Sequence, residues 1–153
     1  MPFILRDTLV IEAPAALVWD VIADLPRYPE WNPFVVGARS SLVVGEPISM
    51  RVQLFPFFVQ PQRETILECV PEQLLGYGVT GTPTNAIRSL RRHELRPEGP
   101  NRTAYCSHFE LDGWLAPLTR ALLGGRLERG FEAATRALKD RAELLERKSR
   151  GEA

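Results

Sequence analysis

The sequence predicts an α+β domain in which a curved antiparallel sheet of about six or seven strands surrounds a long C-terminal helix. Three observations predict this fold. A β-like run at residues 3–12 is followed by a short apolar helix that begins at Pro14. Short β-like segments bounded by proline or glycine come next, and the last third of the chain has helical apolar spacing. One or two short helices are expected after the first strand.

The first helix is predicted from Pro14 to Leu25. Proline suits the first turn of a helix, where its missing N–H would have no partner. Pro26 ends the helix, and residues 27–32 form at most a short second helix. Apolar residues recur at helical spacing between these limits: Leu17, Val18, Val21, Ile22 and Leu25.

Turn residues divide the middle of the chain into six further strand candidates. They are predicted at residues 35–41, 48–55, 63–70, 74–80, 87–96 and 102–111. In the C-terminal third, apolar residues step by three or four and predict one long amphipathic helix. These residues are Leu127, Phe131, Ala134, Leu138, Ala142 and Leu145. Residues 115–123 are predicted to form a shorter helical lead-in, separated from the long helix by a kink or a junction at Gly124 and Gly125.

The composition excludes several classes of protein. The chain has 153 residues, with 19 acidic and 19 basic side chains, so it lacks the net positive charge of a nucleic-acid-binding surface. Two cysteines and two histidines, without a CxxC or HExxH motif, argue against a metal site, and no cofactor is expected. No apolar run reaches the ~20 residues that a membrane-spanning helix needs.

A single domain is predicted at residues 1–147, with a flexible tail at residues 148–153. The β-like pattern starts immediately after Met1, without the charged and apolar regions of a secretory leader. We therefore expect a cytoplasmic protein in which Cys69 and Cys106 are reduced.

Several motifs, taken in order, resemble the START-like helix-grip (SRPBCC) superfamily and its bacterial polyketide cyclase/dehydrase-like branch. They include Ile11-x-Ala13-Pro14 with Val18-Trp19, then Tyr28-Pro29-Glu30-Trp31-Asn32-Pro33, Glu68-x-x-Pro71, Gly113-x-Leu115-x-Pro117 and Gly130-Phe131. The resemblance covers nearly the whole chain. It implies a cavity between the sheet and the C-terminal helix that holds lipids, sterols, polyketides or quinones. Some members of the superfamily are cyclases or hydrolases, and many only bind or carry their ligand.

Side chains alternate across a strand, so residue parity predicts which of them face the cavity. Tyr105 and Phe109 share one parity, and Arg91 and His93 share the inward parity of the preceding strand. One interpretation is that Arg91 or His93 fixes the polar end of an apolar ligand. The other is that Arg91 lies at the rim with its charge in water while His93 is a satisfied core histidine, because a one-residue slip in register would exchange the faces.

A catalytic interpretation assigns His93 as the general base and Tyr105 as the group that polarises a carbonyl. The resemblance weakens this interpretation, because relatives often have an acidic residue where this chain has Phe109.

Other residues are candidates for ligand binding through their apolar character. Phe57 and Phe58 lie in an unusually apolar turn, which is interpreted as a lid, a dimer contact, a membrane-surface contact or buried core. Trp31 and Phe34 lie near the expected mouth of the cavity. The remaining candidates are Leu54, Leu67, Cys69, Tyr77, Leu123, Leu127 and Phe131.

The favoured function is therefore the binding or carrying of a hydrophobic small molecule in an internal cavity. The alternatives are a cyclase- or dehydrase-type enzyme that uses His93, and a dimeric interaction or stress-response module. The expected partner is a hydrophobic ligand, with peripheral membrane contact and a homodimer as further alternatives.

Overall fold

The computed structural model describes residues 2–81 and 83–152 and confirms the predicted α+β helix-grip fold. Within these residues, seven strands form one antiparallel sheet with the order β1-β7-β6-β5-β4-β3-β2. The strands are β1 (Phe3–Ile11), β2 (Val35–Ser40), β3 (Pro47–Phe55), β4 (Phe58–Val70), β5 (Leu74–Gly78), β6 (Arg88–Gly99) and β7 (Arg102–Asp112). The helices are α1 (Ala15–Ala23), η1 (Leu25–Arg27), α2 (Tyr28–Trp31) and α3 (Ala116–Ser149).

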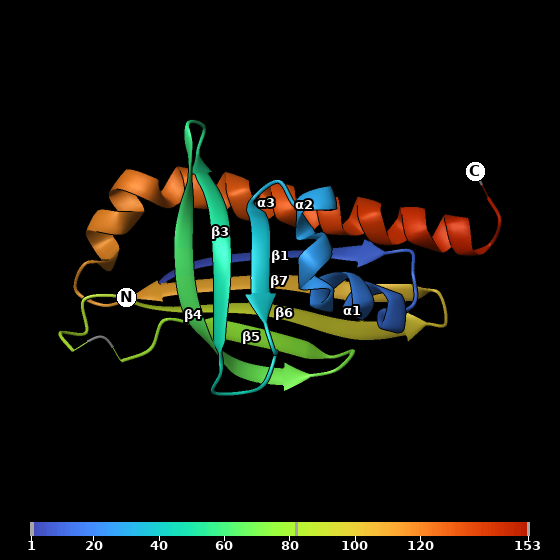
Figure 1. The fold of residues 1–153 in the computed structure, drawn as a ribbon, viewed down its shortest axis with the longest axis horizontal. Coiled ribbons are helices and arrows are strands. Elements are labelled where there is room, and N and C mark those ends of the chain that lie inside the picture. The colour runs from blue at the N-terminus through green and yellow to red at the C-terminus, as the bar shows by residue number, and fades with distance from the viewer. Residues whose placement is uncertain (1, 82, 153) are drawn as a thin grey trace.

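The sheet curves strongly around α3. In Figure 1, strands β2 to β4 run across the direction of β1, β7 and β6, and α3 passes along one side of the molecule. A sheet that is apolar on its inner face must be covered on that face. The short helices α1, η1 and α2 gather at one end, and the first turns of α3 lie at the other end (Figure 1).

The segment between α1 and β2 is fixed by polar contacts of its own side chains. The Tyr28 hydroxyl donates a 2.6 Å hydrogen bond to the carbonyl of Ile22. The side-chain carbonyl of Asn32 accepts hydrogen bonds of 2.9 Å from the backbone N–H groups of Phe34 and Val35. These buried contacts turn the chain into the sheet, so the motif shared with the family supports the wall of the interior.

The pairing of β6 with β7 determines which side chains face α3. Arg91 lies opposite Phe109, and Leu95 lies opposite Tyr105. Paired residues of antiparallel strands share one face of a sheet. All four are buried. His93 and Ser107, which form the residue pair between these two pairs, are also buried.

Strand β4 begins at Phe58, five residues earlier than the sequence predicts. The prediction was wrong because Pro61 was interpreted as a break. Pro61 pairs with Arg51 of β3, whereas β5 pairs with β4 only from Thr65 onward. Proline lacks a backbone N–H and is tolerated where no second neighbouring strand needs that donor.

Helix α3 is continuous from Ala116 to Ser149, so the predicted helical segment at residues 115–123 is its first part and the alternative of a junction between two helices is wrong. Gly124 does not interrupt the helix. A Cβ atom placed on it would lie 3.6 Å from the ring of Phe3, which shows how closely α3 approaches β1 here. The helix also extends two residues into the segment predicted as a tail, whose residue 153 lies outside the described residues.

The packed core occupies the half of the interior beneath α1, η1 and α2. Its fully buried side chains come from the strands, α1 and the second half of α3: Ile11, Val18, Ile22, Ile48, Ile66, Leu75 and Leu138. A smaller cluster of Phe109, Leu111 and Ala116 lies near the start of α3. The short helices α1, η1 and α2 lie away from this second half, which contains the cavity described below.

Gly130 of α3 allows the ring of Phe34 to contact the helix backbone. A Cβ atom on Gly130 would lie 2.3 Å from Phe34 Cε1. We predict that Gly130→Ala lowers the free energy of unfolding by about 1–3 kcal/mol, because overpacking outweighs the better helix propensity of alanine. The measurement is chemical denaturation.

Gly125→Ala provides the matched control, because Gly125 is exposed and its nearest neighbour would be the flexible end of Arg129 at 3.3 Å. This variant is expected to gain up to about 1 kcal/mol from helix propensity. Equal effects of the two substitutions would contradict the tight contact with Phe34.

Candidate ligand cavity

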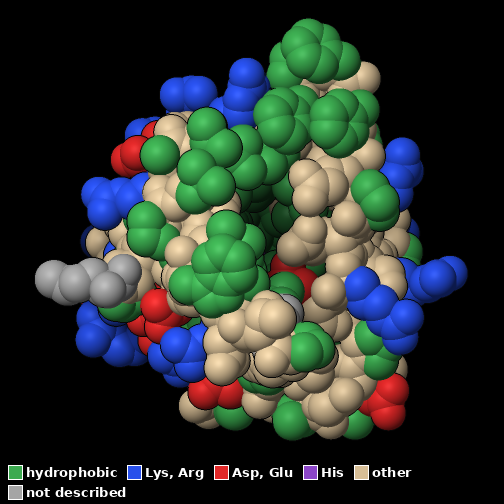
Figure 2. Space-filling view, turned by 90° about the vertical axis from the view of Figure 1, so that its left-hand side faces the viewer, with side chains coloured by type: hydrophobic (Ala, Val, Ile, Leu, Met, Phe, Trp, Pro, Cys, Tyr) green, Lys and Arg blue, Asp and Glu red, His purple; other side chains and the backbone are tan. Residues whose placement is uncertain are grey.

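An open cavity of about 220 Å³ lies between the inner face of the sheet and the first half of α3. Figure 2 shows it as a hollow at one end of the molecule, with hydrophobic side chains around it. Of the ligand-binding residues predicted from sequence, the sheet side contributes Phe34, Leu54, Tyr77, Arg91 and Phe109. Helix α3 contributes Leu123, Leu127 and Phe131. Most of the wall is apolar, as in sites for small organic molecules.

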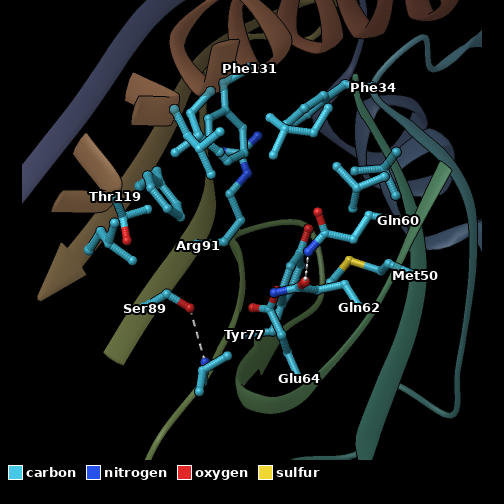
Figure 3. A pocket seen from close by; sticks show the side chains of 18 of the residues that line it. Phe34, Met50, Gln60, Gln62, Glu64, Tyr77, Ser89, Arg91, Thr119 and Phe131 are labelled. Carbon is cyan, nitrogen blue, oxygen red and sulfur yellow. Dashed lines mark hydrogen bonds between the residues drawn. The ribbon is translucent and has the colours of Figure 1, made fainter. Parts of the chain in front are cut away.

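A row of polar side chains on β4 forms part of this wall and was missed in the sequence. Gln60, Gln62 and Glu64 all line the cavity (Figure 3). The Gln60 side-chain amide donates to that of Gln62 at 3.5 Å. Alternation of these three residues was the available signal, but it was overlooked because the strand was predicted to begin after Pro61. Further lining residues not singled out include Met50, Val52, Ser89 and Thr119.

Glu64 is the acidic residue among those that line the cavity. Burial raises the pKa of its carboxyl group from the ordinary value of 4.5 to about 7, although the Gln62 side chain and the charge of Arg91 oppose this rise. Desolvation disfavours the charged form of a carboxyl group. Glu64 therefore exchanges its proton near neutral pH.

Arg91 lies at the back of the cavity with 6% of its surface exposed. Its Nη1 atom donates to Ser107 Oγ at 2.6 Å and to the His108 carbonyl at 3.4 Å. The guanidinium carbon lies 4.6 Å from the centre of the Phe131 ring.

The ion pairs that arginines form within the described residues do not include Arg91. A buried charge needs compensation by hydrogen bonds, a partner or a ligand. Neutral oxygens and the face of the Phe131 ring provide part of this compensation. The guanidinium has five N–H donors, so it can also donate to an oxygen-bearing ligand. This placement contradicts the interpretation that Arg91 keeps its charge in water at the rim.

His93 and Tyr105 lie deeper, beside an inner cavity of about 20 Å³. His93 Nδ1 and the Tyr105 hydroxyl are 2.7 Å apart. Burial, followed by the charge of Arg91, lowers the pKa of His93 well below its ordinary value of 6.5. An inner space of this size holds roughly one water molecule. The structure therefore places the predicted base and its tyrosine away from the open cavity, in a neutral hydrogen-bonded pair.

Other predicted site residues lie outside the open cavity. Trp31 borders the inner cavity, where its ring meets Tyr28 edge-on at 5.1 Å. Leu67 falls at a register shift between Ile66 and Glu68, and Cys69 packs against the main core. The sequence did not reveal this bulge, which interrupts the alternation of side chains along β4.

The apolar turn that contains Phe57 and Phe58 is the tip of the β3–β4 hairpin. Phe57 is 85% exposed and Phe58 is 52% exposed. The buried-core interpretation of this turn is therefore wrong. The ring of Phe58 stacks on that of Phe55 at 5.1 Å between centres, and this contact keeps the two strands of the hairpin together.

Comparison with known proteins identifies the family. Residues 3–143 match the model of the family described as polyketide cyclase / dehydrase and lipid transport. The chain belongs to this family. The START-like superfamily and the cyclase/dehydrase-like branch predicted from sequence are thereby confirmed. No curated protein matches the sequence.

Solved structures of other proteins share the fold. The Zhui aromatase/cyclase from Streptomyces sp. R1128 is 18% identical, with 94% of each chain covered and a TM-score of 0.72. A START superfamily protein from Mycobacterium smegmatis is 19% identical, with coverage of 93% and 98% and a TM-score of 0.69. Norcoclaurine synthase from Thalictrum flavum is 16% identical, with coverage of 92% and 86% and a TM-score of 0.66. These identities establish a common fold and no activity.

The described residues lack two other features. They contain no group of three or more side chains placed to hold a metal ion. None of their helices has the combination of length and apolar character needed to cross a membrane.

The raised pKa of Glu64 predicts a pH-dependent stability. Because folding raises this pKa, the folded state holds the proton more tightly than the unfolded state does. The resulting stabilisation is fully present below the ordinary value of 4.5 and is lost as the pH rises through about 7. Relative to a Glu64→Gln variant, the wild-type protein should lose at most about 3 kcal/mol over this window.

Urea denaturation of both proteins between these pH values measures the difference, with Glu46→Gln as a control at an exposed carboxylate. Parallel stability curves for wild type and Glu64→Gln would show that Glu64 titrates normally.

Proposed function

We propose that this protein binds a hydrophobic small molecule in the open cavity and holds an oxygen-bearing group of that molecule at Arg91. The observation that carries the proposal is a buried guanidinium at the back of an apolar cavity that takes part in none of the arginine ion pairs among the described residues. Few polar groups in an apolar site are enough to orient a ligand. The favoured partner is therefore a molecule with an apolar body and one carbonyl, carboxylate or phenol group.

The arrangement of the walls supports an orientation for the ligand. Leu123, Leu127 and Phe131 of α3 offer an apolar surface, and the row formed by Gln60 and Gln62 lies on the sheet side. In Figure 3 the side chain of Arg91 extends between these two walls toward Phe131. A flat or extended apolar body lying along α3 would place its polar end at Arg91 and its edge along the amides.

The family description and the neighbouring structures support the ligand class. The family includes lipid transport and polyketide cyclisation or dehydration in its description. A lipid, polyketide or quinone combines the apolar body and oxygen atoms that the cavity accommodates. Carrying such a molecule requires no chemistry at Arg91.

Acid–base catalysis of the cyclase or dehydrase type is a second candidate, and Glu64 favours it. A general acid or base works best when its pKa is near the working pH. Glu64 lines the open cavity with a pKa of about 7. His93, the base predicted from sequence, is neutral and lies beside the inner cavity. The stability titration of Glu64→Gln also tests this candidate. If Glu64 is ionised throughout the neutral range, it has no proton to donate there, and the argument for acid–base catalysis fails.

Arg91 should distinguish two fluorescent probes of nearly the same shape. 1-Anilinonaphthalene-8-sulfonate carries an anionic group, whereas N-phenyl-1-naphthylamine has the same aromatic body without it. We predict that Arg91→Met weakens binding of the sulfonate about 10-fold to 100-fold, the range expected for a lost charged hydrogen bond. Binding of the neutral probe should change little, because the apolar walls remain.

Fluorescence titration gives both dissociation constants. Arg88→Met is the control, because Arg88 is exposed and paired with Asp112 at 2.8 Å. Equal weakening of both probes, or no weakening of the sulfonate, would contradict the role proposed for Arg91.

A further inference from the structure

The mouth of the open cavity is surrounded by exposed apolar side chains. Nine large hydrophobic side chains are exposed within the described residues, and five of them belong to segments that border this mouth. They are Phe57, Phe58, Trp114, Leu118 and Leu122, with exposed fractions of 85%, 52%, 66%, 56% and 70%. We refer to these five residues as the apolar rim. Figure 2 shows hydrophobic side chains gathered around the hollow at this end.

Each part of the rim continues a wall of the cavity. Phe57 and Phe58 form the hairpin tip above Leu54 and Gln60, which line the cavity. Leu118 and Leu122 precede Thr119 and Leu123, which line it from α3. A molecule that leaves the cavity therefore passes directly between rim side chains. Apolar surface gathered at one place on a monomer marks an interaction site.

Contacts between the segments hold the rim together. The guanidinium carbon of Arg126 on α3 lies 5.1 Å from the centre of the Phe55 ring on the hairpin. The indole N–H of Trp114 donates a 3.0 Å hydrogen bond to the carbonyl of Thr84. The hairpin tip and the start of α3 are thus linked, and Trp114 is held by Thr84, so the cost of ordering the rim is already met before any partner binds.

The charged residues within the segments around the rim are all basic. Residues 53–62, 79–87 and 113–127 contain Arg120 and Arg126 and no aspartate or glutamate, although the whole chain has 19 acids and 19 bases. Both arginines are exposed, and exposed Arg51 and Arg63 flank the hairpin. Asp112, next to the last of these segments, is paired with Arg88.

An apolar aromatic surface surrounded by arginines complements an anionic lipid bilayer. Tryptophan and phenylalanine enter the boundary between headgroups and acyl chains, and arginines attract anionic headgroups. Two copies meeting through this rim would bring like charges together, which disfavours a symmetric dimer. Because the rim surrounds the mouth of an apolar cavity, contact with a bilayer would bring that mouth next to the lipids.

We propose that the apolar rim docks on the surface of anionic lipid bilayers, with the cavity mouth against the membrane. In this orientation an apolar molecule moves between bilayer and cavity without crossing water. The contact is peripheral, since the rim consists of side chains at a hairpin tip and at the start of one helix.

Vesicle flotation without added ligand tests the proposal independently of what the cavity binds. The full chain is mixed with vesicles of phosphatidylcholine, or of phosphatidylcholine with phosphatidylglycerol. Wild-type protein should float with the anionic vesicles, and added salt should release it because salt screens the arginines. Absence of flotation with anionic vesicles at low salt would overturn the proposal.

Variants distinguish binding through the rim from nonspecific adsorption of exposed apolar side chains to the vesicles. Phe57→Ser with Leu122→Ser should weaken vesicle binding at least about tenfold, from the loss of buried apolar area. Arg120→Gln and Arg126→Gln should each weaken binding to anionic vesicles about fivefold. The matched control is Val43→Ser with Val44→Ser, two valines that are 56% and 57% exposed in the turn between β2 and β3.

The control variant should bind as the wild-type protein does. Equal loss in the control and rim variants would overturn the proposal. Sedimentation velocity at the same protein concentration tests the alternative that a second copy of the chain binds the rim. A wild-type dimer that the Phe57→Ser, Leu122→Ser variant abolishes, together with no flotation, would assign the rim to a second copy of the chain. Thermal unfolding confirms that each variant is folded.

Discussion

The interior depends on the contact of Phe34 with α3. The ring of Phe34 meets that of Phe131 edge-on at 5.0 Å and lies against the backbone at Gly130. Both rings border the open cavity and the small inner cavity. One helix is too narrow to fill a strongly curved sheet, so the short helices complete the packing on one side of this contact. On the other side the space stays open, because the short helices do not extend over it.

The region between the two cavities also explains why a charge is stable inside the protein. Arg91 borders both cavities, and its guanidinium stacks on Phe131 while it donates to Ser107. Its charge lowers the pKa of His93 and opposes the rise in the pKa of Glu64. One buried cation therefore lowers the pKa of both His93 and Glu64, whereas burial lowers the pKa of His93 and raises that of Glu64. His93 stays neutral in the packed half, and Glu64 exchanges a proton in the open half.

Much of this arrangement follows from sequence periodicity, and the rest follows from packing between distant segments. The two-residue period of a strand predicts that Arg91 and Phe109 share the inner face. It does not predict that Pro61 is accommodated beyond the end of β5, or that a bulge displaces Leu67. The division into two cavities is a tertiary property, so sequence alone could not place His93 in the closed one.

We propose that the open half of the interior is a ligand site, and the closed half is packed core. Intermolecular NOE spectra of methyl-labelled protein with 1-anilinonaphthalene-8-sulfonate test this most directly. NOEs to Met50, Leu123 and Leu127, which line the cavity, and none to the fully buried Leu75 and Leu138 are predicted. Absence of NOEs to the cavity methyls, with NOEs only to the exposed Leu118 and Leu122, would contradict the account, because the probe would then bind the surface rather than the interior.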